Sequence, residues 1–104
     1  MKWGDALDIE YKTNKLKNVC TNASEAQRVY GAKMAEKIHQ RIDEIRASDS
    51  VEFMIANNIG RCHPLKLNRE GQYAVDLVHP YRLIFIKLNE ELKIVKIEDI
   101  RDYH

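Results

Sequence analysis

Basic and histidine side chains gather in residues 61–69 of this 104-residue chain. Arg61, His63, Lys66 and Arg69 lie there with no acidic residue among them, although the whole chain carries a formal net charge of only +1. Such a local excess of positive charge in a nearly neutral protein favours a small pocket for a phosphate group. A solvated surface loop is the alternative interpretation of the same segment.

A second set of reactive side chains ends the chain, where Asp102, Tyr103 and His104 are the last three residues. Arg82 adds a cation inside an apolar stretch, residues 81–88. A guanidinium in such a stretch must be paired or must open onto a cleft, because burial of an unpaired charge is unfavourable. Arg82 is therefore a candidate for the same phosphate pocket.

Together these groups supply what metal-free cleavage of a phosphodiester requires. Histidine and aspartate can transfer protons, the cations can stabilise charge on a phosphate, and a tyrosine ring can stack on a base. The ribose 2′-hydroxyl would lose its proton to a base and attack the adjacent phosphorus, and an acid would protonate the departing oxygen to leave a cyclic phosphate. Structural roles are the alternative: His63 could hydrogen-bond a turn, Asp102 could neutralise Arg82 or Arg101, and Tyr103 could cover a sheet edge.

The composition is that of a single globular domain spanning residues 1–104, with 44% hydrophobic and 32% charged residues. No apolar run approaches the roughly 20 residues that cross a bilayer, and residues 1–12 lack the apolar core of a signal peptide, so we expect a cytoplasmic protein with no membrane contact. Cys20 and Cys62 are expected to be free thiols. The spacing of histidines and cysteines matches no metal motif, and we expect neither a metal nor another cofactor.

The apolar periodicity predicts an α+β domain. Ser24 and Gln27 have the spacing of a capping box, so one long helix should begin there and bury Met34, Ile38 and Ile42 along one stripe. A period of two marks the strands, and the stretch with Arg82 should be central in the sheet. The predicted strands are residues 8–11, 73–77, 81–88 and 92–100; the predicted helices are residues 15–20, residues 24–47 and a short helix after Ser50.

The motif HPLK-x-x-R-x-GQYAVDLVHPYRLIF, residues 63–85, and the final DYH resemble the RelE/ParE superfamily of toxins from bacterial toxin–antitoxin systems. The resemblance is closest to the HigB-type "killer" branch. It implies a RelE-like, microbial-RNase-like fold, with N-terminal helices packed on an antiparallel β-sheet. It also implies a ribosome-dependent endoribonuclease, or mRNA interferase, that cuts mRNA without a metal and so inhibits translation and growth.

The resemblance also suggests which residues carry the activity. It implies that His63, Lys66 and Arg82 form the phosphate and transition-state pocket, and that the chain end supplies acid/base and base-positioning groups, namely Asp102, Tyr103 and His104. We expect RNA contacts from Arg61, Arg69 and Tyr73. Leu67 stands where the family usually has glycine, and Asn68 where aspartate is common.

The implied partners are the ribosome with its mRNA and a HigA-like antitoxin with a helix-turn-helix domain, through which alone operator DNA would be contacted. A net charge of +1 also argues against direct binding of long nucleic acid by charge. The alternative is a non-enzymatic toxin or binding module, similar to ParE, that poisons DNA gyrase. The histidines and the DYH ending favour the nuclease.

Overall fold

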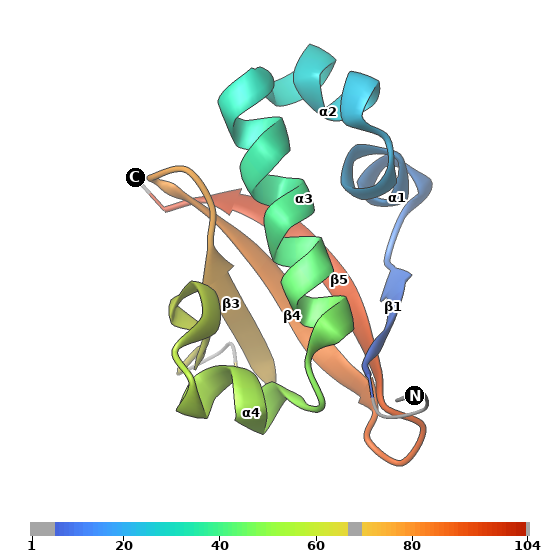
Figure 1. The fold of residues 1–104 in the computed structure, drawn as a ribbon, viewed down its shortest axis with the longest axis vertical. Helices are drawn as coiled ribbons and strands as arrows, with labels where there is room; N and C mark the ends of the chain where they lie inside the picture. Colours follow the sequence, from blue (N-terminus) through green and yellow to red (C-terminus); the bar gives the residue numbers. More distant parts are fainter. Residues whose placement is uncertain (1–5, 67–69, 104) are drawn as a thin grey trace.

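The computed structural model describes residues 6–66 and 70–103 of the chain (Figure 1). It forms one five-stranded sheet with strand order β1-β5-β4-β3-β2. The strands are β1 (Asp8–Tyr11), β2 (His63–Pro64), β3 (Gln72–Asp76), β4 (Tyr81–Asn89) and β5 (Ile94–Asp102). The helices are α1 (Asn14–Thr21), α2 (Ala23–Tyr30), α3 (Ala32–Ala47), α4 (Val51–Ala56) and the 3-10 turn η1 (Ile59–Arg61).

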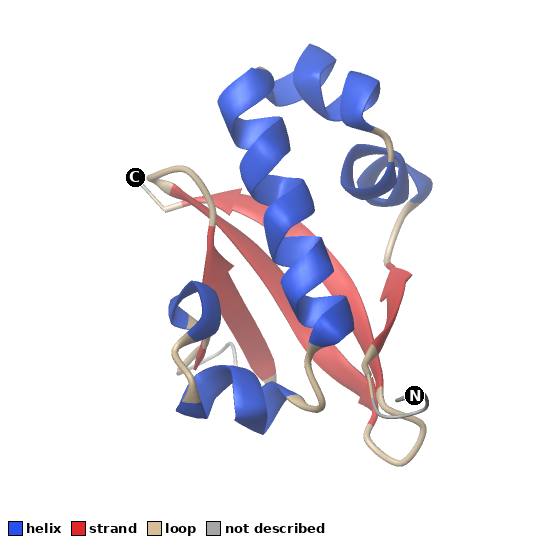
Figure 2. Ribbon diagram, in the orientation of Figure 1, coloured by secondary structure: helices blue, strands red, loops and turns tan. Residues whose placement is uncertain are grey.

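The helices lie on one face of the sheet, with α3 running across β4 and β5 (Figure 2). The predicted stripe of α3 is buried there, and Ile38 and Ile45 have no exposed surface. Leu83 and Phe85 of β4 complete the same core from the sheet side. Burying one such side chain contributes about 1.5–3 kcal/mol, so this contact between α3 and β4 is a main source of stability. The α+β prediction and the central position of β4 are confirmed.

The sheet is mixed, whereas the sequence predicted an antiparallel one. The first strand, β1, pairs in parallel with β5, with Ile9 opposite Val95. The other strand pairs are antiparallel as expected. Parallel strands need a long crossover connection, and here nearly the whole chain separates the two. A local period of two identifies a strand but carries no information about so distant a partner.

The predicted long helix over residues 24–47 is two helices. Gly31 separates α2 from α3 and has φ +89°, a conformation that L side chains rarely adopt. The predicted capping box is also wrong, because the side chain of Asn22 caps α2 by accepting from the backbone N–H of Glu25 at 3.1 Å. The apolar stripe from Met34 to Ile45 lies wholly within α3, so its period carried no information about a break at Gly31.

The predicted strand over residues 92–100 is shifted to Ile94–Asp102, because Lys93, with φ of 58°, still belongs to the turn. β2 lies within the segment predicted as a basic loop.

Other local predictions hold. Ser50 caps α4 by accepting from the N–H of Phe53, and α1 covers the predicted residues 15–20. Cys20 and Cys62 are buried free thiols. No helix in the described part of the chain is long and apolar enough to cross a membrane.

Candidate functional site

Arg82 projects from the sheet face that faces away from the helices. Leu83 and Phe85 point into the core, and side chains alternate along a strand, so Arg82 lies on the other face. Its cross-strand neighbours there are Asp76 of β3 and Arg101 of β5. We call this surface the Arg82 face; it carries Ala74, Asp76, Arg82, Ile84, Asp99 and Arg101.

The chain end folds back onto Arg82. The backbone N–H of Tyr103 donates to the carbonyl of Pro80 at 3.0 Å, which ties the residue after β5 to the loop before β4. In Figure 1 the end of β5 lies beside the β3–β4 loop. As a result the guanidinium carbon of Arg82 lies 4.6 Å from the centre of the Tyr103 ring. The predicted meeting of Arg82 with the chain end is thus observed at Tyr103.

Asp76 pairs with two arginines of this region, which the sequence analysis did not foresee. One carboxylate oxygen lies 3.0 Å from Nε of Arg61, and the other lies 3.7 Å from Nε of Arg82. A signal was present in the sequence: Asp76 and Arg82 flank the connection between two predicted strands, so a hairpin would set them opposite each other. The charge of Arg82 is therefore paired, as its place on a central strand requires.

The η1 turn presents Arg61 to Asp76. Asn58, Gly60 and Arg61 have φ of 54°, 57° and 56°, so the backbone turns sharply here. A side chain at Gly60 would force Arg41 to move, because an added Cβ would lie 2.8 Å from Nε of Arg41. The turn then runs directly into β2 and His63.

His63 lies half-buried on β2, opposite Ala74 and therefore on the Arg82 face. Its Nδ1 is 2.8 Å from the carbonyl oxygen of Arg61. A carbonyl only accepts, so Nδ1 must carry the proton in this contact. In the neutral ring the lone pair then resides on Nε2, which is the atom that could accept a proton from a substrate.

Two other predicted site residues occupy strand positions on the opposite side of the sheet from Arg82. Asp102 lies opposite Tyr81 in the register of β4 and β5. Asp76 and Asp99 form ion pairs with Arg82 and Arg101, respectively. Tyr73 stacks on Phe85 at 5.8 Å, on the core side of the sheet. Lys66 is exposed just after β2.

Arg69 and His104, together with Leu67 and Asn68, lie outside the described residues. The predictions for them therefore remain predictions. Among residues 6–66 and 70–103, no group of three or more histidine, cysteine or acidic side chains is placed to hold a metal ion.

The cysteine next to the site is unsuited to nucleophilic chemistry. Burial raises the pKa of the Cys62 thiol to about 12, and it does the same to the pKa of Cys20. A thiol reacts through its thiolate, so neither side chain is a nucleophile near neutral pH.

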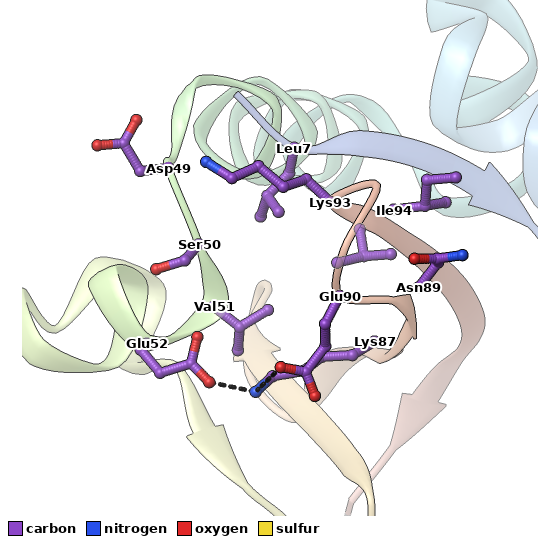
Figure 3. Close-up of a pocket in the computed structure, with 11 residues that line it drawn as sticks. Leu7, Asp49, Ser50, Val51, Glu52, Lys87, Asn89, Glu90, Lys93 and Ile94 are labelled. Carbon is purple, nitrogen blue, oxygen red and sulfur yellow. Dashed lines mark hydrogen bonds and ion pairs between the residues drawn. The ribbon is translucent and has the colours of Figure 1, made fainter. Parts of the chain in front are cut away.

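A separate pocket of about 70 Å³ lies at the other end of β4 (Figure 3). Leu7, Val51 and Lys87 line it, and Lys87 reaches across to pair with Glu52 of α4 and with Glu90. None of the predicted site residues within 6–66 and 70–103 lines this pocket. Its volume suits a few water molecules rather than a nucleotide.

Helices packed on one face of a mixed five-stranded sheet define a RelE-like α+β fold, and solved structures share it. A YoeB–YefM complex from Staphylococcus aureus is 22% identical, with 94% of this chain and 97% of that chain covered and a TM-score of 0.62. A YoeB/ParE toxin from Agrobacterium tumefaciens is 14% identical, with 94% and 100% covered and the same TM-score. No protein-family model and no curated protein matches the chain significantly. The chain therefore has the fold of the YoeB/ParE toxins.

Proposed function

We propose that this chain is the toxin of a toxin–antitoxin system, of the HigB-type branch of the RelE/ParE superfamily, and that it cleaves mRNA on the ribosome. The observation that supports this proposal most directly is the contact between Arg82 and Tyr103, which joins the RLIF end of the HPLK…RLIF motif to the DYH chain end. The shared fold of the YoeB and ParE toxins supports the same proposal.

The chemistry proposed for the site is metal-independent attack of a ribose 2′-hydroxyl on the neighbouring phosphorus. Arg82 stabilises the charge that develops on the phosphate oxygens, and Lys66 adds a second cation. His104, together with Asp102 or His63, transfers the protons: one of these groups accepts the proton of the 2′-hydroxyl, and another protonates the departing oxygen. Tyr103 offers its ring to position a base beside Arg82. Arg61 and Arg69 bind the RNA backbone.

The proposed partners are the ribosome, its mRNA and a helix-turn-helix antitoxin of the HigA type that keeps the toxin inactive. One similar structure is a complex of YoeB with YefM, so an antitoxin related to YefM is the competing possibility. Co-purification of the chain with the product of its neighbouring reading frame, followed by sequencing of that product, distinguishes the two.

The test of the nuclease is cleavage of a reporter mRNA in a bacterial cell-free translation extract. Purified chain should create new 5′ ends within the reading frame, and a translation inhibitor that empties the ribosome of mRNA should abolish them. Arg82→Ala should lower the cleavage rate by about a hundredfold or more, as expected when a charge-stabilising group is lost. Arg28→Ala is the control, since Arg28 lies on exposed α2 and pairs only locally with Glu25.

An absence of new 5′ ends with the wild-type chain would overturn the nuclease proposal. The alternative of a ParE-like gyrase poison is assayed in parallel with purified gyrase and relaxed plasmid. Inhibited supercoiling with intact mRNA would favour that function instead.

A further inference from the structure

Three arginine side chains from three different elements converge on Asp76. Arg61 of η1 and Arg82 of β4 pair with its two carboxylate oxygens. Arg41 of α3 donates from Nε to its backbone carbonyl at 2.7 Å. Arg41 of the helix layer thus fixes the backbone of Asp76, and the carboxylate of Asp76 pairs with two arginines of the candidate site.

The backbone contact is built with little freedom. The side chain of Arg41 is only 14% exposed, and its Nη1 also donates to Glu44 at 2.8 Å. Gly60 leaves the space that this guanidinium fills. The guanidinium of Arg41 is fixed by its hydrogen bond to Glu44 and by burial, so it loses little further entropy when Nε binds the carbonyl of Asp76. The end of β3 therefore has a defined position.

The carboxylate contact leaves part of Arg82 available. One carboxylate oxygen of Asp76 lies 3.7 Å from Nε of Arg82, which is an ion-pair distance rather than a hydrogen bond. The guanidinium has further N–H donors on its two terminal nitrogens, which this contact does not use. Tyr103 supports the flat face of the same group. An ion pair at Nε and a ring against the guanidinium together restrict the orientation of this planar cation more than either contact alone.

We propose that Asp76 is a positioning residue for Arg82: it holds the guanidinium by Nε against the Tyr103 ring, so that the terminal nitrogens remain for the phosphate of the RNA. The inference rests on the proposed function and adds to it a residue that contacts no substrate atom. Asp76 also neutralises part of the charge of two neighbouring cations, which lets both lie near one phosphate site without repelling each other.

The first experiment compares cleavage rates in the cell-free translation assay. Asp76→Asn keeps the shape but removes the charge, and the rate should fall by about ten- to a hundredfold, the usual effect of misplacing a catalytic group. Asp76→Glu keeps the charge and should restore most of the rate. The matched control is Glu25→Gln, which removes another carboxylate that pairs with an arginine, on α2, and should leave the rate unchanged. Equal rates for Asp76→Asn and wild type would overturn the proposal.

A double variant separates positioning from a general loss of structure. If Asp76 acts through Arg82, then Asp76→Asn should cost nothing further in a chain that already carries Arg82→Ala. Additive losses would overturn the proposal. Urea unfolding of each variant shows that the comparison is made between folded proteins.

A spectroscopic measurement decides the inference even if the wild-type chain cuts no mRNA. The Nε–Hε signal of Arg82 in a nitrogen–proton NMR spectrum is assigned by its loss in Arg82→Lys. Asp76→Asn should shift this signal and weaken its response to added inorganic phosphate, and Asp76→Glu should retain more of both. An Arg82 signal that Asp76→Asn leaves unmoved would refute positioning, whereas absent cleavage with the expected shifts would refute only the proposed function.

Discussion

The guanidinium of Arg82 lies over the face of the Tyr103 ring, with 4.6 Å between its carbon and the ring centre. A cation in this position is attracted by the ring quadrupole, by about 0.5–2 kcal/mol depending on solvent exposure. The attraction belongs to the ring and not to the hydroxyl. The hydroxyl of Tyr103 is buried and has no hydrogen-bond partner among the described residues. Loss of the hydroxyl and loss of the ring of Tyr103 should therefore have different effects.

Tyr103→Phe should keep the contact with Arg82 and remove a buried hydroxyl that lacks a partner. The free energy of unfolding should stay equal or rise by up to about 1 kcal/mol, because an unpaired buried polar group is unfavourable. Tyr103→Ala should lower it, because the ring and its contact are lost. Urea unfolding of both variants measures the difference, and an equal loss in the two would show that the hydroxyl has a partner.

Gly60→Ala should destabilise the protein by about 1–2 kcal/mol. The alanine would have to keep the left-handed backbone conformation of Gly60, and its Cβ would lie too close to the side chain of Arg41. In a chain that already carries Arg41→Ala the same change should cost less, since the atoms that the Cβ would meet are gone. Thermal and urea unfolding of the four proteins test this. The same loss in both backgrounds would assign the whole effect to backbone strain.

Glu52→Gln should reduce stability at neutral pH by less than about 1 kcal/mol, the usual range for an exposed ion pair. The hydrogen bond from Lys87 holds the pKa of Glu52 below its ordinary value of 4.5. A lowered pKa in the folded state means that the stabilisation is present above pH 4.5 and is lost as the pH falls through the folded-state pKa. Unfolding curves at neutral and acidic pH should therefore converge for wild type and variant.

Lys87 provides the control for this prediction, because the pKa of Lys87 is raised by its hydrogen bond with Glu52. In a chain that carries Lys87→Gln, the change Glu52→Gln should have a smaller pH-dependent effect in the same range, because only the backbone hydrogen bond of Glu52 still lowers the pKa of its carboxyl group. An undiminished effect would show that Lys87 does not cause the pH dependence.

Cys20 and Cys62 should resist alkylation in the folded protein. Both are buried, and burial raises the pKa of each thiol to about 12, so iodoacetamide at pH 8 meets very little thiolate. Mass spectrometry across a urea series should show modification only as the chain unfolds. Rapid modification of Cys62 without urea would mean that the η1 turn opens in the native state.

The local pattern of apolar and charged residues was sufficient to predict most helices and strands and to mark Arg82 as a candidate site residue. Alternation identified the strands around Arg82, and an arginine within an apolar strand had to be paired or exposed to a cleft, because burial of a lone charge is too unfavourable. The apolar stripe of α3 was visible for the same reason: a helix that packs on a sheet repeats its core positions every three or four residues.

Only the tertiary structure decided which distant residues meet. The parallel pairing of β1 with β5 and the meeting of Arg82 with Asp76 depend on strand register. A shift of one residue would move every side chain of a strand to the other face. Arg41 reaches Asp76 only because α3 crosses the sheet beside Gly60. Residue types therefore predicted a phosphate site, and packing determined which charged groups contact Arg82.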